Sequence, residues 1–145
     1  MVEKYEPQIT PWEIKESDCL AGAKTEEKLK FLLRYAILAP SSHNSQLWKF
    51  AIRDDNEIKV FTDKARWLKV ADSDQRELHI SVGCAMENLL VAAEHSGYGH
   101  SVKYFPGGED GPVACVKLNP GGRVQRPRDS VLFDMIPHRN TNHSL

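Results

Sequence analysis

The sequence contains few cysteines, and their spacing excludes two common uses of this residue. Only three occur among 145 residues, Cys19, Cys84 and Cys115, and no two of them form a CxxC pair. An odd number of widely separated cysteines argues against a disulfide framework and against a zinc site. We therefore expect no metal site, and reduced thiols in a cytoplasmic setting.

Long apolar runs and an excess of charge of one sign are also lacking. No stretch of about 18 apolar residues occurs, so no transmembrane helix is predicted, and the first residues have no apolar signal core. The net charge of −1 argues against a general nucleic-acid-binding protein, which needs a basic surplus. No glycine-rich loop of the GxGxxG or P-loop type is present, so a Rossmann-type site is not predicted.

The apolar patterns predict a single α+β domain over residues 25–136, preceded by an irregular arm (1–24) and followed by a tail (137–145). Leucines at three- and four-residue spacing predict a first helix that begins at an N-cap, Thr25, and ends before Pro40. Residues 48–53 and 57–62 have the pattern of a hairpin, and residues 101–105 and 113–118 that of two further strands. Such short connections favour a mainly antiparallel sheet.

The longest predicted helix covers residues 74–96 and forms the centre of the domain. Asp74 followed by Glu77 fits a capping box at its start, and Gly97 is placed to end it in the left-handed conformation. Apolar side chains occur on nearly every side of residues 80–93, which is typical of a buried helix. A short helix at residues 129–136, ended by Pro137, is predicted to follow.

The polar stretch between the first helix and the first strand is the strongest candidate for a site. Residues 40–48 read PSSHNSQLW, and serine, asparagine and glutamine side chains both donate and accept hydrogen bonds. Such groups suit the uncharged edge of a flat heterocycle that alternates carbonyl and N–H groups. A polar loop on rigid flanks is a common place for a binding site, although proline, serine and asparagine are also ordinary turn residues.

This loop resembles the flavin-binding loop of the nitroreductase family, A-P-S-x-x-N-x-Q-P-W followed by a strand. Leu47 stands where the family usually has proline. Residues 76–98 resemble the central helix of the family, and residues 63–72 resemble the linker before it. His43 before Asn44 looks most like the Acg-like branch, in which two nitroreductase-like halves form one longer chain, and this chain resembles the first half.

The C-terminal tail carries a further piece of the resemblance. Arg139-x-Thr141-Asn142 is similar to the R-x-T-N-R element that opens the second half in that branch, with His143 in place of the second arginine. Arginine offers a bidentate fork to a phosphate, and the other two side chains add neutral donors. The alternative is a frayed terminus without a ligand. The N-terminal arm lacks the paired-arginine phosphate motif of ordinary nitroreductases.

The resemblance implies an FMN-dependent oxidoreductase that passes electrons from NAD(P)H to a nitroaromatic, a quinone or a similar acceptor. It implies a homodimer, with no nucleic-acid or membrane partner. The residues it implies for cofactor binding are Ser41, Ser42, Asn44, Gln46, Arg139, Thr141 and Asn142. No catalytic residue is predicted, because the cofactor carries the chemistry.

Alternatives stay open at this level. The chain ends where the family continues, so it is either a truncated or split form or one that completes its site with another chain. Two other functions are therefore considered: flavin binding or sequestration without turnover, and a scaffold half that needs a partner half. His43 is a candidate acid or base beside the flavin. Cys84 is a candidate nucleophile, although a cysteine in an apolar helix is more often a core residue.

Overall fold

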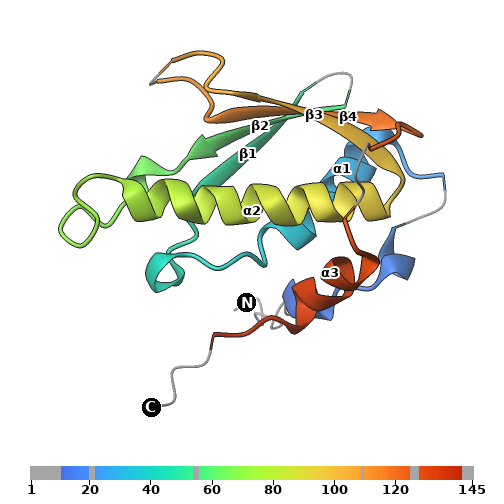
Figure 1. The fold of residues 1–145 in the computed structure, drawn as a ribbon, viewed down its shortest axis with the longest axis horizontal. Coiled ribbons are helices and arrows are strands. Elements are labelled where there is room, and N and C mark those ends of the chain that lie inside the picture. Colours follow the sequence, from blue (N-terminus) through green and yellow to red (C-terminus); the bar gives the residue numbers. More distant parts are fainter. Residues whose placement is uncertain (1–10, 20–21, 54–55, 109, 125–127, 142–145) are drawn as a thin grey trace, which may run out of the picture.

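Two layers make up the fold: a four-stranded antiparallel sheet, and helices that cover one of its faces (Figure 1). The computed structural model describes residues 11–19, 22–53, 56–108, 110–124 and 128–141. In chain order the main elements are α1 (Thr25–Ala36), β1 (Trp48–Arg53), β2 (Glu57–Thr62), α2 (Arg76–His95), β3 (Tyr98–Tyr104), β4 (Ala114–Pro120) and α3 (Ser130–Met135).

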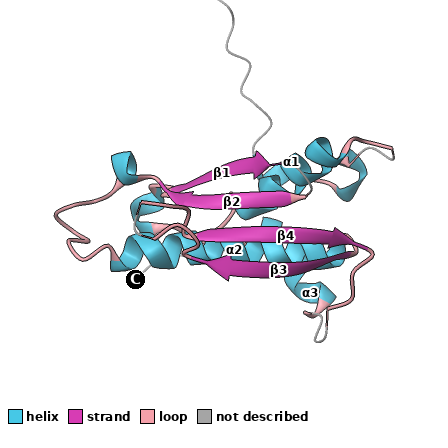
Figure 2. Cartoon of the chain, turned by 90° about the horizontal axis from the view of Figure 1, so that it is seen from above, coloured by secondary structure: helices cyan, strands magenta, loops and turns pink. Residues whose placement is uncertain are grey.

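The sheet has the strand order β1-β2-β4-β3, and every neighbouring pair is antiparallel. β1 and β2 have the predicted bounds, whereas β3 and β4 extend beyond theirs, to Tyr98 and Pro120. Because side chains alternate along a strand, one face is apolar and packs on α2, with Ile58 and Val116 fully buried. The other face is polar. Seen from above, the strands lie in front of α2 and no helix covers them (Figure 2).

α2 is the longest helix of the described chain, and it packs both against the sheet and against α1. Leu89 and Ala85 on its inner side are completely buried. As predicted, α2 has the most buried residues of the described helices. One side of it is nevertheless open, because Ile80 is 52% exposed and Gly83 and Glu87 are exposed beside it. The sheet and α1 cover most of the circumference of α2 but leave this stripe open.

The predicted capping box of α2 is wrong. The helix begins at Arg76, not Asp74, and the Arg76 N–H donates to the carboxylate of Asp74 at 3.3 Å. The next two N–H groups donate to the carboxylate of Asp72, from Glu77 at 2.9 Å and from Leu78 at 2.8 Å. Burial raises the pKa of Asp72, but these backbone hydrogen bonds outweigh burial and lower it. A buried carboxylate outside the helix thus accepts hydrogen bonds from N–H groups of the first turn, which have no partner within the helix. Gly97 ends the helix with φ +80, as predicted.

α1 begins one residue earlier than predicted. Thr25 is the first helical residue and Lys24 is the N-cap. The N–H of Lys24 donates to the carboxylate of Glu27 at 2.9 Å, so a side chain from inside the first turn satisfies it. Before α1, the described part of the N-terminal arm forms two single 3-10 turns, Pro11–Glu13 and Glu16–Asp18, and buries Ile14 between them.

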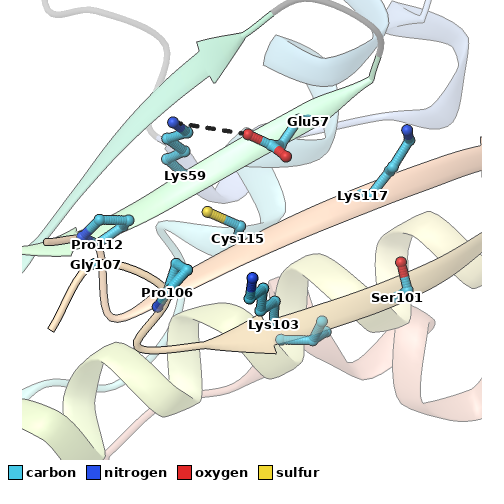
Figure 3. A pocket seen from close by; sticks show the side chains of 10 residues that line it. Glu57, Lys59, Ser101, Lys103, Pro106, Gly107, Pro112, Cys115 and Lys117 are labelled. Carbon is cyan, nitrogen blue, oxygen red and sulfur yellow. Dashed lines mark ion pairs between the residues drawn. The ribbon is translucent and has the colours of Figure 1, made fainter.

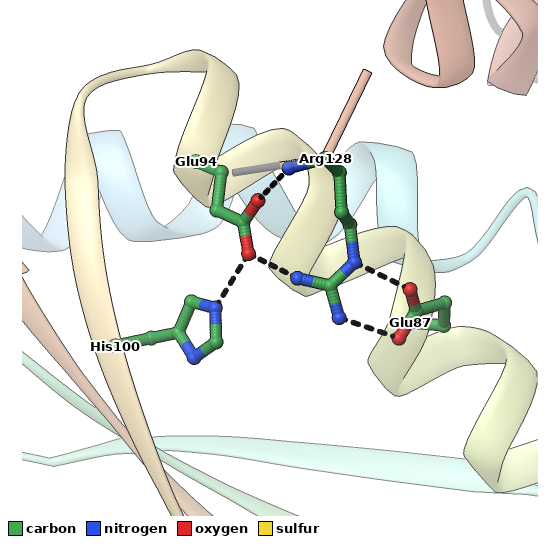
Figure 4. A network of polar contacts seen from close by, with 4 residues as sticks. All are labelled: Glu87, Glu94, His100 and Arg128. Atoms are coloured by element: carbon green, nitrogen blue, oxygen red, sulfur yellow. Dashed lines mark hydrogen bonds and ion pairs between the residues drawn. The ribbon is translucent and has the colours of Figure 1, made fainter. Parts of the chain in front are cut away.

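An ion-pair network attaches the segment before α3 to α2 (Figure 4). The guanidinium of Arg128 forms a bidentate pair with Glu87, with N–O distances of 2.6 and 2.9 Å, and a second pair with Glu94. The Arg128 backbone N–H donates to Glu94 at 2.9 Å, and Nε2 of His100 lies 2.7 Å from the same carboxylate. This network sets the position from which α3, with Asp129 as its N-cap, leads into the tail.

Candidate functional site

The loop between α1 and β1 has an unusual backbone. It contains one 3-10 turn, Ser42–Asn44, and three residues with positive φ: His43 at 50°, Asn44 at 53° and Gln46 at 50°. Residues other than glycine seldom adopt this region. Conformations of this kind persist where the surroundings fix them, and they cluster at functional sites.

Side chains of the loop and of α2 fix this conformation. The Ser41 hydroxyl accepts from the N–H of Gln46 at 2.9 Å, which closes the loop on itself. The N–H of Ser42 donates to the Ser81 hydroxyl at 3.2 Å, and the Ser42 hydroxyl donates to the carboxylate of Glu77. α2 therefore holds the loop at Ser42. Sequence reasoning did not identify Glu77 and Ser81 as site residues, because they lie more than 30 positions further along the chain.

Leu47, which stands in the place of the family's usual proline, anchors the other end of the loop. Its side chain is 1% exposed and its carbonyl accepts from the N–H of Asp63 at 2.8 Å. Asp63 also pairs with Lys49 of β1 at 2.9 Å. The bond from Lys49 and a hydrogen bond from the backbone lower the pKa of Asp63, against the effect of burial. With leucine in place of proline at position 47, the loop therefore remains attached to the core.

The C-terminal tail lies against the loop of its own chain. Nε and one terminal nitrogen of Arg139 donate to the carbonyl of Leu38, at 3.3 and 3.2 Å, and the other terminal nitrogen donates to the hydroxyl of Thr141 at 3.2 Å. The guanidinium carbon is 5.4 Å from the centre of the Trp12 ring. Asn142 and His143 lie outside the described residues.

Loop and tail together enclose a cavity of about 920 Å³. The structure brings four of the predicted residues to it: Ser41, Asn44, Arg139 and Thr141. Ser42 instead lines a smaller neighbouring cavity of about 240 Å³ together with Glu77, and Gln46 is exposed away from the larger one.

Trp12 and His138 also line the larger cavity and were not predicted. Trp12 carried only a weak signal, as an aromatic residue in an otherwise polar arm. His138 carried none, because only the fold brings it opposite the loop.

The chemistry of this cavity suits an uncharged heterocycle that bears an anionic group. Among the described residues that line it there is no carboxylate; their side chains include a guanidinium, hydroxyls, amides and the imidazoles of His43 and His138. Its volume falls within the range of sites that hold small molecules and cofactors. In the described part of the chain, no group of three His, Cys, Asp or Glu side chains could hold a metal ion. No helix there is long and apolar enough to cross a membrane.

Comparisons with known proteins concern the family and the fold of the chain. A family model described as "Putative TM nitroreductase" matches residues 12–93. A "Putative NAD(P)H nitroreductase" of Mycobacterium tuberculosis is 31% identical over 117 residues, which are 80% of this chain and 33% of the relative. The "Putative NAD(P)H nitroreductase acg" of the same organism is 34% identical over 86 residues, 59% of this chain and 26% of that protein.

The chain thus spans a third or less of the length of these curated relatives. Among solved structures, a "Putative NADH dehydrogenase/NAD(P)H nitroreductase" from Bacteroides thetaiotaomicron superposes with a TM-score of 0.57 at 19% identity, over 75% of this chain and 81% of that one. At this identity the likeness concerns the fold, which confirms the predicted α+β architecture.

Proposed function

The chain belongs to the nitroreductase family, and from this we propose that it binds FMN between its loop and its tail. We propose further that bound FMN serves electron transfer from NAD(P)H to a nitroaromatic, a quinone or a similar acceptor. The observation that carries the proposal is the meeting of Arg139 with the loop of residues 40–44 in one cavity.

The residues of this cavity fit the cofactor by charge and by hydrogen-bonding capacity. A phosphate is matched by the guanidinium of Arg139, because planar N–H groups pair with phosphate oxygens in two places at once. The Thr141 hydroxyl, already 3.2 Å from Arg139, offers a neutral donor beside it. The hydroxyl of Ser41 and the amide of Asn44 suit the uncharged ring, because each can donate a hydrogen bond to a ring carbonyl and accept one from a ring N–H.

The residues of the chain hold and orient the cofactor, and FMN when bound supplies the redox chemistry by accepting a hydride and passing electrons on. Ser41 and Ser42 act mainly on the loop, since their hydroxyls are engaged by Gln46 and Glu77. Asn44 is exposed at the cavity and is free to meet a ligand. The imidazoles of His43 and His138 also line the cavity and add ring nitrogens that can take part in hydrogen bonds to a ligand.

An absorbance spectrum of the purified protein, reconstituted with FMN if necessary, tests the proposal. We expect a bound flavin spectrum that bleaches under anaerobic addition of NADH or NADPH and returns when an acceptor is added. Protein that binds no flavin at all, even at high FMN concentration, would contradict the proposed site. A bound flavin that neither nicotinamide bleaches would favour the alternative function, flavin binding without turnover.

The phosphate assignment has its own test, which compares FMN with riboflavin. The wild-type chain should prefer FMN, because only FMN carries the phosphate for Arg139. Arg139→Gln should lose most of this preference while binding riboflavin as before, and Arg53→Gln, on β1 and away from the cavity, should keep it. Equal discrimination by both variants would remove Arg139 from the proposed site.

A further inference from the structure

The uncovered face of the sheet carries a basic groove (Figure 3). Side chains of β2, β3 and β4 form its floor, and the hairpin loop between β3 and β4 forms one wall. Its volume is about 510 Å³, which is the size of a small-molecule site. Three lysines line it, Lys59, Lys103 and Lys117, with Cys115 in the floor between them.

Backbone pairing brings these side chains together. Cys115 of β4 is directly opposite Lys59 of β2 and directly opposite Lys103 of β3. Directly opposed residues of neighbouring strands lie close together and point to the same face of the sheet. In the next such row, Lys117 is flanked by Glu57 and Ser101. The register of the sheet, rather than the choice of side-chain rotamer, therefore concentrates the ammonium groups on this face.

The groove is basic in a chain that carries a net charge of −1. Among the described residues that line the groove, Glu57 is the one carboxylate, and its oxygen is 3.9 Å from Nζ of Lys59. Lys103 and Lys117 are both exposed. Like charges gathered on one face repel each other, and a bound anion relieves this repulsion. Lysine ammonium groups are common ligands of phosphate.

The wall of the groove is apolar, unlike its charged floor. Pro106 and Pro112 belong to the hairpin loop and present rigid apolar rings above the charged floor. A ligand that pairs with the lysines of the floor and packs on the prolines of the wall has a multiply charged phosphate end and a flat or apolar body. We propose that this groove binds a nucleoside diphosphate, with the diphosphate over Cys115 and the base against the proline wall.

This site is separate from the loop-and-tail cavity, with which it shares no lining residue. The groove opens on the outer face of the sheet, whereas Ser42 and Glu77 of the loop region meet on α2, beneath the sheet (Figure 1). Binding in the groove is therefore measured independently of FMN, and the proposal does not depend on the FMN site.

Protection of Cys115 from alkylation tests the proposal on the full chain. All three cysteines have intermediate exposure, so neutral iodoacetamide labels them, and peptide mass spectrometry separates their rates. ADP at ten times its Kd should slow labelling of Cys115 about tenfold, because only the free groove exposes the thiol. Cys84, on the open stripe of α2, is the internal control and should keep its rate. Adenosine, which lacks the phosphates, should give no protection.

Lysine variants test whether the lysines of the groove bind the ADP that protects Cys115. Lys103→Gln combined with Lys117→Gln should weaken ADP binding by about tenfold or more, because each lost ammonium removes a charge-assisted hydrogen bond. Lys24→Gln, the same change before α1, should bind ADP as the wild type does. The proposal is overturned if ADP leaves the Cys115 rate unchanged, if it slows Cys84 equally, if adenosine protects as well as ADP, or if the double variant binds ADP normally.

Discussion

At the scale of single residues, the loop between α1 and β1 has an unfavourable backbone conformation at two residues whose side-chain amides are exposed. Gln46 and Asn44 both have positive φ, which costs each about 1–3 kcal/mol, and their side chains are exposed. Ser41 and Ser42, by contrast, already use their hydroxyls inside the protein. A cofactor in the larger cavity is therefore expected to contact the amide of Asn44, which lines it, more than the serine hydroxyls.

The first prediction follows for Asn44→Ala combined with Gln46→Ala. Asn44 lines the cavity proposed for FMN and Gln46 does not, so the double variant should weaken FMN binding by about 0.5–1.5 kcal/mol through the loss of one hydrogen bond from Asn44. Fluorescence titration of FMN measures this, with Ser45→Ala as a loop control that leaves both amides in place. Unchanged affinity in the double variant would show that the loop does not contact the ring.

Glu94 gives a prediction about pH. Burial raises the pKa of its carboxyl, but the Arg128 backbone N–H, His100 and the guanidinium charge outweigh burial and lower the pKa below its ordinary value of 4.5. A carboxyl with a lowered pKa in the folded state stabilises the fold above its ordinary pKa, and this stabilisation is lost as the pH falls through the lowered value.

Glu94→Gln should therefore lower the free energy of unfolding at neutral pH by about 1–3 kcal/mol, because it leaves the Arg128 donors poorly matched. The difference from wild type should shrink when denaturant unfolding is repeated below pH 4.5. Glu87→Gln is the matched control: that carboxylate is 55% exposed, so its loss should cost less at every pH. An effect of Glu94→Gln that does not depend on pH would contradict the assignment.

At the scale of elements, α2 contributes most of the core. Leu89 of this helix is fully buried and belongs to the hydrophobic core. Leu89→Ala should cost about 2–5 kcal/mol through the cavity that it leaves. Leu132→Ala, the same substitution on α3 at a position that is 49% exposed, should cost less than about 1 kcal/mol. Denaturant unfolding of both variants measures this, and a loss below 0.5 kcal/mol for Leu89→Ala would place the core elsewhere.

The outer stripe of α2 has a different role. Ile80 is half exposed, and with Cys84 and Pro40 it lines the small cavity beside the loop. An exposed apolar stripe on the central helix is a typical feature of an interface. Since Glu77 on the same helix holds Ser42, a partner that covers this stripe would also cover the base of the loop.

At the scale of the whole molecule, we predict a homodimer formed through this stripe of α2. If the dimer is obligate, its two-fold interface should bury more than about 2,000 Å² in total. The expected exchange of terminal segments stays a prediction, but in the structure Arg139 meets the loop of its own chain. One chain therefore encloses the cavity without a contribution from a second copy.

Light scattering at micromolar concentration tests this assembly. The wild type should have a dimer mass and Ile80→Lys a monomer mass, because the interface would take a charged ammonium group out of water in the middle of the stripe. Val131→Lys, which places the same charge on the exposed face of α3, should remain dimeric. A wild-type monomer with full flavin occupancy would exclude the dimer as a requirement of the site, and a monomer without flavin would point to a missing partner half.

The sequence by itself determined the elements whose signals are local. The bounds of β1 and β2, the end of α2 at Gly97 and the polar loop all follow from alternation, turn residues and one short motif. These features depend on residues within a few positions of each other, so they can be predicted without the fold. The resemblance of the loop to a family pattern added the candidate cofactor in the same local way.

Only the tertiary structure decided what lies opposite the loop. Asp72 caps α2 in place of the predicted box, Glu77 turns away from the helix start to hold Ser42, and Arg139 reaches the carbonyl of Leu38 across 101 positions. The partner of a side chain at such separations has no periodic or local signal, because it is chosen by how the layers pack. The sequence therefore predicted which residues could bind a cofactor, and packing determined which of them share one cavity.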